Sequence, residues 1–348
     1  MGERQIMTKT DFKPKNITKA LLSALPLRAR EVLISRYGLG KATEPMTLES
    51  IGKKYDITRE RVRQIENHAL QSIRKSDTFK KNESFLKELE EKIHALGGIV
   101  SEEELLRHLS KDKSVQNHVH FLLVIGDSFV HHKEDEEFIR RWHVNEELAK
   151  QVHDALRRLY VNLSDDDLIP ESKLLESFLN ELKDLNEKYR QEEILRRWLS
   201  LSKKIAKNPL GEWGSAQSPN VRAKGMRDFA YLAIKRHGSP MHFTEVARSI
   251  TELFNRKAHV ATCHNELIKD KRFVLVGRGL YALSEWGYSS GVVKDVLRQI
   301  LKKEGPLTRD EIIDRIRKER YVKDNTILVN LQDTSVFARD KSGRYILA

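Results

Sequence analysis

Apolar residues recur every three to four positions along most of the chain, a spacing typical of amphipathic helices. The pattern is sharpest between residues 47 and 75. A short amphipathic segment follows Thr47, residues 55–57 interrupt it, and a longer segment follows Thr58. Threonine is a good helix N-cap, so each segment starts at a cap. The inward positions of the longer segment are Val62, Ile65, Ala69 and Ile73. Two helices with a short break between them predict a helix-turn-helix.

The outward face of the longer helix is polar in its first two turns. Arg59 and Arg63 flank a stripe that contains Glu60, Gln64 and Asn67. An arginine fork fits guanine, glutamine fits adenine, and glutamate accepts a hydrogen bond from cytosine. These residues predict a helix that reads bases in the major groove of DNA. The alternative is a solvated helix whose charges form ordinary salt bridges.

The same stretch carries a family resemblance. Residues 25–39, 47–52 and 58–66 resemble region 4 of the sigma-70 family of transcription initiation factors, and the resemblance extends over residues 20–76. It implies that the second helix binds the minus-35 element of double-stranded promoter DNA. It also implies core RNA polymerase as a partner, with the surface at Tyr37 and Leu39 meeting the flap of the β subunit. The implied base-reading residues are Arg59, Glu60, Arg63 and Gln64, and the predicted DNA-binding set also includes Thr58, Arg61 and Asn67.

From residue 85 onward the chain repeats one pattern. Residues 94–109, 235–250 and 302–316 each end a helix at glycine, pass an apolar residue and a cap, and open a second amphipathic helix. This order is the front half of a winged helix. Strand, glycine turn and strand follow in residues 272–283 and 335–347. A weaker wing is predicted from strands at 128–132 and 137–139.

The spacing of the glycines predicts a further copy. Gly238 lies 140 residues after Gly98, and Gly305 lies 67 after Gly238. A module of roughly 70 residues therefore fits into the longer gap. We expect it to begin near Leu168 and to have residues 192–201 as its third helix.

The copy at residues 222–288 carries a second resemblance. Its segments 225–231, 240–246 and 276–286 resemble the HARE-HTH domain, a winged helix that also forms the N-terminal domain of the polymerase delta subunit. The resemblance implies contact with DNA or with polymerase. From the pattern alone, 258–269 is the third helix and Arg278 is at the wing tip, where a phosphate or a minor groove is in reach. The alternative is a turn arginine in water.

The predicted fold class is mainly α: a sigma region 4-like helix-turn-helix followed by tandem winged-helix modules with small β wings. Residues 1–16 lack an apolar period and are expected to be disordered. A polar connection at 75–82 follows the first module. The expected modules are the helix-turn-helix at 17–78 and winged helices at 82–145, 147–214, 222–288 and 289–348.

Charge and composition add expectations about partners and location. The 348 residues carry a formal net charge of +12, which favours a polyanionic partner. Residues 101–138 hold nine acidic and four basic groups, whereas residues 202–280 hold six acidic and fifteen basic groups, so we expect some modules to bind DNA and others to bind protein.

There is no apolar run of about 18 residues, no apolar signal region and only one cysteine, Cys263. We therefore expect no contact with a membrane, and we expect the protein to be cytoplasmic.

The sequence offers no chemistry for catalysis. It has neither a phosphate-binding glycine loop nor a dinucleotide fingerprint, and Cys263–His264 has no evident orienting partner. We expect no enzyme, cofactor or small-molecule substrate. We also expect no metal site, because cysteines are absent near the candidate histidines and their spacing matches no usual site. These histidines are His118, His120, His131 and His132.

The functional hypothesis is a DNA-binding, polymerase-associated factor in bacterial transcription initiation or its regulation. A region-2-like helix with clustered aromatics is not found, so a complete sigma factor is not expected. One alternative is a delta-like polymerase accessory subunit without sequence-specific DNA binding. Another is a reader in a restriction or DNA-modification system.

Overall fold

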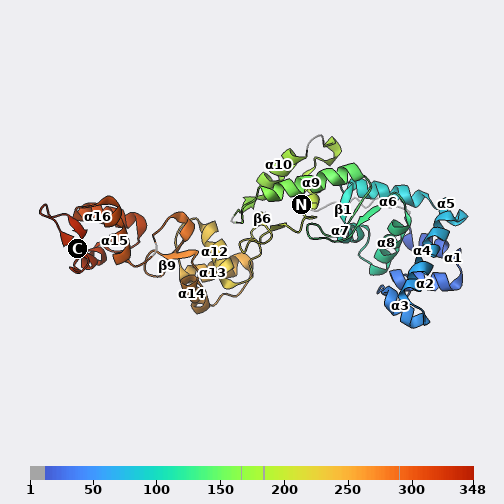
Figure 1. Cartoon of the computed structure of the whole chain (residues 1–348), viewed down its shortest axis with the longest axis horizontal. Helices are drawn as coiled ribbons and strands as arrows, with labels where there is room; N and C mark the ends of the chain where they lie inside the picture. Colours follow the sequence, from blue (N-terminus) through green and yellow to red (C-terminus); the bar gives the residue numbers. More distant parts are fainter. Residues whose placement is uncertain (1–11, 166, 183–184, 290) are drawn as a thin grey trace. The chain divides into compact units, whose positions relative to one another are not determined.

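The computed structural model describes residues 12–165, 167–182, 185–289 and 291–348 (Figure 1). They are mostly helical with small antiparallel sheets, and this confirms the predicted fold class. The chain divides into two compact units. The first comprises Met1–Leu163 and Glu171–Ala206, and the second comprises Ser164–Pro170 and Lys207–Ala348.

The first unit starts with the predicted helix-turn-helix. Thr47 and Thr58 cap its two helices, because their side-chain oxygens accept hydrogen bonds from the N–H groups of Ser50 and Arg61. Asp56, in the left-handed region at φ 51°, ends the first of them. A small core closes the motif around three side chains, Val32, Ile51 and Val62. The helices are α1 (Pro14–Ser23), α2 (Leu27–Tyr37), α3 (Leu48–Tyr55) and α4 (Arg59–Lys75).

Two segments expected to be irregular contain helix. In the predicted disordered stretch, residues 1–11 lie outside the described residues, but Pro14 opens α1, where proline's fixed φ suits a first turn. The expected polar connection at 75–82 contains α5 (Asp77–Lys81). Ser76 caps α5, and Phe79 is buried against the core. The prediction of disorder was therefore wrong for residues 14–16, and the polar connection is helical where one capping residue and one apolar residue support it.

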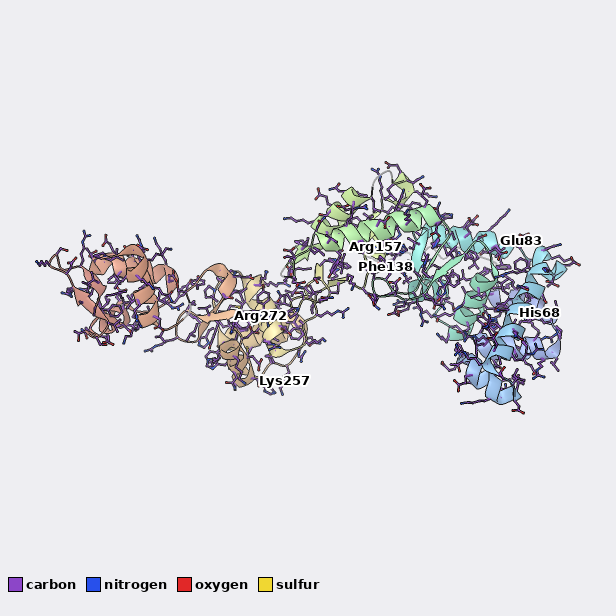
Figure 2. The ribbon with its side chains drawn as sticks, viewed as in Figure 1. His68, Glu83, Phe138, Arg157, Lys257 and Arg272 are labelled. Atoms are coloured by element: carbon purple, nitrogen blue, oxygen red, sulfur yellow. The ribbon has the colours of Figure 1, made fainter. Side chains whose placement is uncertain are left out.

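The 82–145 module has the winged-helix order of elements. Its sheet runs β1–β3–β2, and both strand pairs are antiparallel. The predicted second wing strand at 137–139 was wrong, since β3 lies at Arg141–His143 and Phe138 is instead buried beside Arg157 (Figure 2). The elements are α6 (Ser84–Ala95), β1 (Ile99–Ser101), α7 (Glu102–Leu109), α8 (Lys113–Ile125), β2 (Val130–His132) and β3.

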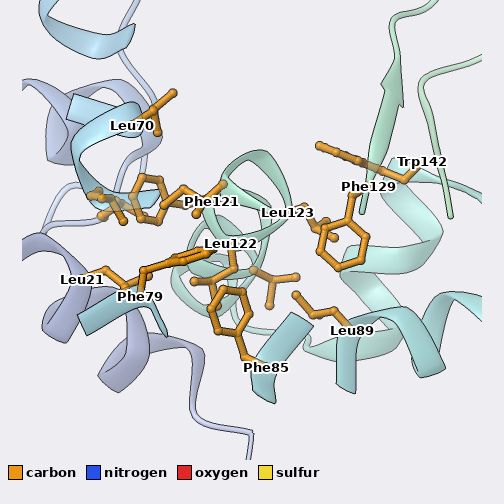
Figure 3. Close-up of a cluster of buried hydrophobic side chains, with 14 of the residues drawn as sticks. Leu21, Leu70, Phe79, Phe85, Leu89, Phe121, Leu122, Leu123, Phe129 and Trp142 are labelled. Atoms are coloured by element: carbon orange, nitrogen blue, oxygen red, sulfur yellow. The ribbon is translucent and has the colours of Figure 1, made fainter. Parts of the chain in front are cut away.

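The helix-turn-helix and this module share one hydrophobic core. Phe121, Leu122 and Leu123 of α8 are fully buried in it (Figure 3). Around them lie Leu21, Leu70 and Phe79 from the helix-turn-helix side, and Phe85, Leu89, Phe129 and Trp142 from the winged-helix side. Apart from the small core at Val32, Ile51 and Val62, the two predicted modules therefore do not enclose separate cores, and their limits as domains stay a prediction.

Polar contacts fix α8 at both ends. Near its start, Asn117 Nδ2 donates to the carbonyl oxygens of Gly38 at 3.0 Å and Thr43 at 2.6 Å. Near its end, Arg74 of α4 donates to the carbonyl oxygens of Val124 and Ile125. A guanidinium at a helix C-terminus satisfies orphan carbonyls and complements the helix dipole. Contacts from the helix-turn-helix, at Gly38, Thr43 and Arg74, therefore fix the position of α8, which belongs to the 82–145 module.

The same order of elements recurs at residues 146–215. The copy was expected to begin near Leu168, where β4 and α10 lie, and the helix predicted at 192–201 is confirmed as α11. The limits of this copy as a domain stay a prediction. In the second unit, β4 pairs antiparallel with β6, and the Asn208 N–H donates to the Glu212 carbonyl in the turn before β6. The elements are α9 (Glu146–Val161), β4 (Ile169–Pro170), α10 (Glu171–Glu181), α11 (Glu192–Leu199), β5 (Ile205–Lys207) and β6 (Glu212–Ser215).

The second unit contains the 222–288 module, whose sheet runs β7–β9–β8. Gly238, at φ 75°, ends its first helix as predicted. Arg272, at the start of the wing, bridges the carboxylates of Asp228 and Asp270 at 2.9 and 2.7 Å (Figure 2). The elements are α12 (Met226–His237), β7 (Met241–His242), α13 (Phe243–Phe254), α14 (Val260–Lys269), β8 (Phe273–Leu275) and β9 (Leu280–Leu283).

The last module follows in the same unit. Its first strand is reduced to a single bridge between Leu307 and Tyr345. The elements are α15 (Val293–Glu304), α16 (Arg309–Glu319), α17 (Asp324–Leu331), β10 (Phe337–Arg339) and β11 (Tyr345–Leu347). In the described part of the chain, none of the helices has the length and apolar character that a membrane crossing requires.

The shared core leads to a stability prediction. Replacing Leu122 by Ala should lower the free energy of unfolding of the first unit by about 2–5 kcal/mol, because the substitution leaves a cavity at a fully buried position. Amide hydrogen exchange should show reduced protection in α4 as well as in α6. The matched control is Leu27→Ala, since Leu27 is 69% exposed, and its effect should stay within about 0.5 kcal/mol. Reduced protection in α6 alone would contradict a shared core.

Candidate nucleic-acid interface

The predicted DNA-binding residues of the helix-turn-helix lie together on the surface. Thr58 precedes α4, and all seven predicted side chains are exposed. His68 continues this surface one turn further along (Figure 2). The opposite side of α4 is buried at Val62, Ala69 and Ile73, as predicted. The helix therefore presents its polar face to solvent from the first turn onward.

Two pairs of these side chains are bonded to each other. Arg63 donates to both carboxylate oxygens of Glu60 at 2.9 and 2.6 Å, and Arg61 donates to Gln64 Oε1 at 3.1 Å. The hydrogen bond with Arg63 lowers the pKa of Glu60, and the same bond raises the pKa of Arg63. Exposed pairs of this kind contribute little stability, so either side chain can leave its partner and bind a base edge at a small cost in free energy.

Arg59 and Asn67 differ from these pairs. Neither side chain forms a hydrogen bond or an ion pair with any other residue that the structure describes. Their polar groups face water and can meet DNA without breaking a bond within the protein.

The approach of α3 to α4 depends on Gly52. A Cβ atom added there would lie 2.6 Å from the carbonyl oxygen of Ile57, closer than real Cβ contacts allow. Glycine therefore permits the tight turn that sets the angle between the two helices. Lys53 and Lys54 stand exposed on the last turn of α3, beside the start of α4.

Glu66 holds α4 against α2 from the buried side. Its Oε1 accepts a hydrogen bond from the Tyr37 hydroxyl at 2.9 Å and another from Arg36 Nε at 3.3 Å. Burial raises the pKa of Tyr37, and the charge of Glu66 adds to this effect. Sequence reasoning missed this role, although Glu66 lies at helical spacing from Val62 and Ala69 on the inward side.

The predicted polymerase-binding residues lie in the packing against α8. The Tyr37 ring meets Phe121 edge to face at 5.2 Å between centroids, and Leu39 is only 9% exposed. Exposed groups close to them are in the loop that follows, at Lys41 and Glu44. A polymerase contact at Tyr37 and Leu39 stays a prediction.

The remaining predicted DNA contact lies in the second unit. Arg278 is exposed in the turn between β8 and β9, which agrees with its predicted place at the wing tip. The same unit has an open hollow of about 770 Å³ lined by residues 216–228. Three of its lining residues are basic and exposed: Arg222, Lys224 and Arg227.

The candidate histidines do not form one cluster. His118 and His120 lie on α8, and His131 stacks on Trp142 at 4.5 Å while it pairs with Glu102. His132 turns the other way and lies close to His143 and Glu146. Sequence reasoning missed these last two residues because it placed the second wing strand too early.

Comparison with known proteins supports the first module. The family described as "Sigma-70, region 4" matches residues 21–75. The RNA polymerase sigma factor RpoD of Neisseria gonorrhoeae is 41% identical over 70 residues, which are 20% of this chain and 11% of that protein. The chain thus matches about a tenth of the length of this relative. Residues 21–75 contain a sigma-70 region 4 domain, a DNA-binding module of transcription.

The hydrogen bond between Tyr37 and Glu66 leads to a prediction. Tyr37→Phe removes a donor from a buried carboxylate, so the free energy of unfolding of the first unit should fall by about 1–3 kcal/mol. Urea unfolding followed by helix circular dichroism measures the change. Tyr160→Phe is the control, because the structure gives the Tyr160 hydroxyl no hydrogen bond to any described residue, and its effect should stay within about 0.5 kcal/mol. Equal effects of the two variants would contradict a structural role for this hydrogen bond.

Proposed function

We propose that the protein is a sigma-70-like, RNA polymerase-associated transcription factor that recognises a minus-35-like promoter element through α4. The observation that carries the proposal is the exposed polar start of α4 within a matched region 4 domain. Arginine, glutamate and glutamine at the N-terminal end of a helix are the groups that read base edges in the major groove. The named relative is a sigma factor, and promoter recognition is inferred for this chain from that likeness.

The helix caps and the tight turn favour recognition of bases over electrostatic binding to DNA of any sequence. Thr58 and Gly52 fix the start and the angle of α4, so Arg59, Glu60 and Gln64 are held on a rigid element. Side chains that specify bases need such fixed geometry, whereas phosphate binding tolerates loose positions. Lys53 and Lys54 are the groups we assign to the phosphate backbone.

The polymerase half of the proposal rests on the same likeness. We infer that the exposed loop after Leu39, with Lys41 and Glu44, forms the surface next to the β flap, while Tyr37 and Leu39 support it from within. A factor that works on bacterial polymerase acts in the cytoplasm.

The delta-like alternative has one observation in its favour. The 222–288 module, which resembles a HARE-HTH domain in sequence, exposes four large apolar side chains among its described residues: Leu253, Val260, Ile268 and Leu275. Apolar groups on a surface fit a protein partner better than DNA. In this alternative the second unit binds polymerase, and sequence-specific DNA binding by α4 plays no part.

Substitutions on α4 separate base reading from electrostatic binding. Gln64→Ala or Arg63→Ala should weaken binding to a selected duplex by about 1–3 kcal/mol and change binding to a scrambled duplex little. Lys53→Ala should weaken both duplexes and lower the salt slope by about 0.9, because one phosphate fewer is neutralised. Titrations of the full chain at several salt concentrations measure both quantities.

Gln71→Ala is the matched control for these variants. Gln71 is exposed on α4 but lies two turns beyond Gln64, so its removal should leave both affinities unchanged. If Gln64→Ala and Arg63→Ala weaken both duplexes equally, α4 is only an electrostatic surface and the delta-like alternative gains.

The polymerase partner needs its own experiment. Immobilised full-length protein should retain core RNA polymerase, and free β flap added in excess should release it. Charge reversal in Lys41→Glu should weaken retention several-fold, whereas Lys75→Glu, at the far end of α4, should not. Failure to retain core polymerase would contradict this half of the proposal and leave the DNA half standing.

A further inference from the structure

The wing of the 82–145 module ends where three side chains with metal-binding atoms meet. In the antiparallel pair of β2 and β3, His132 is opposite Arg141, so His143 is its diagonal neighbour on the same face of the sheet. Glu146 follows in the first turn of α9. Nε2 of His132 lies 2.8 Å from Nε2 of His143, which lies 3.3 Å from Oε2 of Glu146.

These distances approach those of a coordinated ion. The three ligand atoms all lie within 4.8 Å of one another. In a tetrahedral zinc site with bonds of about 2.0–2.1 Å, neighbouring ligand atoms are roughly 3.3 Å apart. The distance from His143 to Glu146 already matches this value, and the two histidine nitrogens need to separate by only about half an ångström.

We propose that His132, His143 and Glu146 bind a divalent first-row transition-metal ion such as Zn²⁺. Two imidazoles and one carboxylate form a donor set that suits Zn²⁺, Ni²⁺ or Cu²⁺. Mg²⁺ and Ca²⁺ prefer oxygen ligands alone, so the site discriminates against them. The inference concerns the wing and goes beyond the proposed recognition of DNA by α4.

One side of the proposed metal site is buried and the other faces solvent. The His143 side chain is 1% exposed, and the Glu146 side chain is 77% exposed. An ion therefore enters past Glu146, and the side that faces solvent leaves a fourth position for water.

Two neighbouring side chains, Arg141 and His153, do not take part in binding the ion. Arg141 lies on the same face of the sheet, and its charge opposes a bound cation. Its guanidinium is paired with Asp135 at 3.2 Å, and its Nε donates to Nε2 of His153 at 2.7 Å. Asp135 offsets the positive charge, while His153 has its lone pair occupied and does not serve as a ligand.

A bound ion would join elements that are separate in sequence. His132 ends β2, His143 ends β3, and Glu146 opens α9. Coordination would fix the end of the wing to the start of the following helix, so metal binding should stabilise the first unit.

The test uses full-length protein freed of metal by a chelator. Competition titration against a chromophoric chelator should show one high-affinity Zn²⁺ per chain, and Zn²⁺ should raise the melting temperature, whereas Mg²⁺ should not. Glu146→Gln and His132→Asn should each weaken Zn²⁺ binding at least about tenfold and abolish the thermal shift. Both positions are at least partly exposed, so these variants should fold.

Two matched variants control for surface effects. Glu147→Gln makes the same change of charge in the same turn of α9, and His108→Asn removes an exposed histidine from α7. Both should bind Zn²⁺ like the wild-type protein. If the full chain binds no Zn²⁺, or if Glu146→Gln and His132→Asn bind it as tightly as the controls, the cluster is only a hydrogen-bonded histidine pair and the proposal fails.

Discussion

The burial of α8 is the constraint on which the first unit depends. From Asn117 to Ile125 nearly every side chain of this helix is buried, so the helix needs neighbours all around it. The helix-turn-helix covers one side and the first winged helix covers the other. Asn117 and Arg74 then fix its ends with hydrogen bonds to backbone carbonyls. Burying each such leucine or phenylalanine contributes about 1.5–3 kcal/mol, which outweighs the polar contacts in sum.

This packing has a consequence for function. The buried side of α4 is held by Glu66 and by the shared core, so its opposite side is presented to solvent as a rigid surface. Base-reading residues need this rigidity, since a shift of a fraction of an ångström breaks paired hydrogen bonds. The same packing encloses Tyr37 and Leu39. The region 4 domain therefore leaves its predicted DNA surface exposed, while part of its predicted polymerase surface lies in the core.

The sequence was most informative where one physical signal dominated. Helical spacing and threonine caps predicted α3 and α4, and glycine followed by a cap predicted α7, α13 and α16. Prediction failed where long-range packing decides. Phe79 turns a polar connection into α5, and Phe138 is buried outside the wing, so β3 starts later and brings His143 to His132. The paired states of Arg63 with Glu60 and of Tyr37 with Glu66 also depend on side-chain geometry that spacing does not give.

The central claim is that α4 holds its polar groups ready to recognise one DNA sequence. The most direct measurement is the ratio of affinities of the full-length wild-type protein for a duplex selected from a random pool and for its scrambled counterpart. The ratio should reach about a thousandfold or more and persist as salt weakens both complexes. A ratio near one at every salt concentration, or failure of the pool to converge on a shared sequence, would contradict the account.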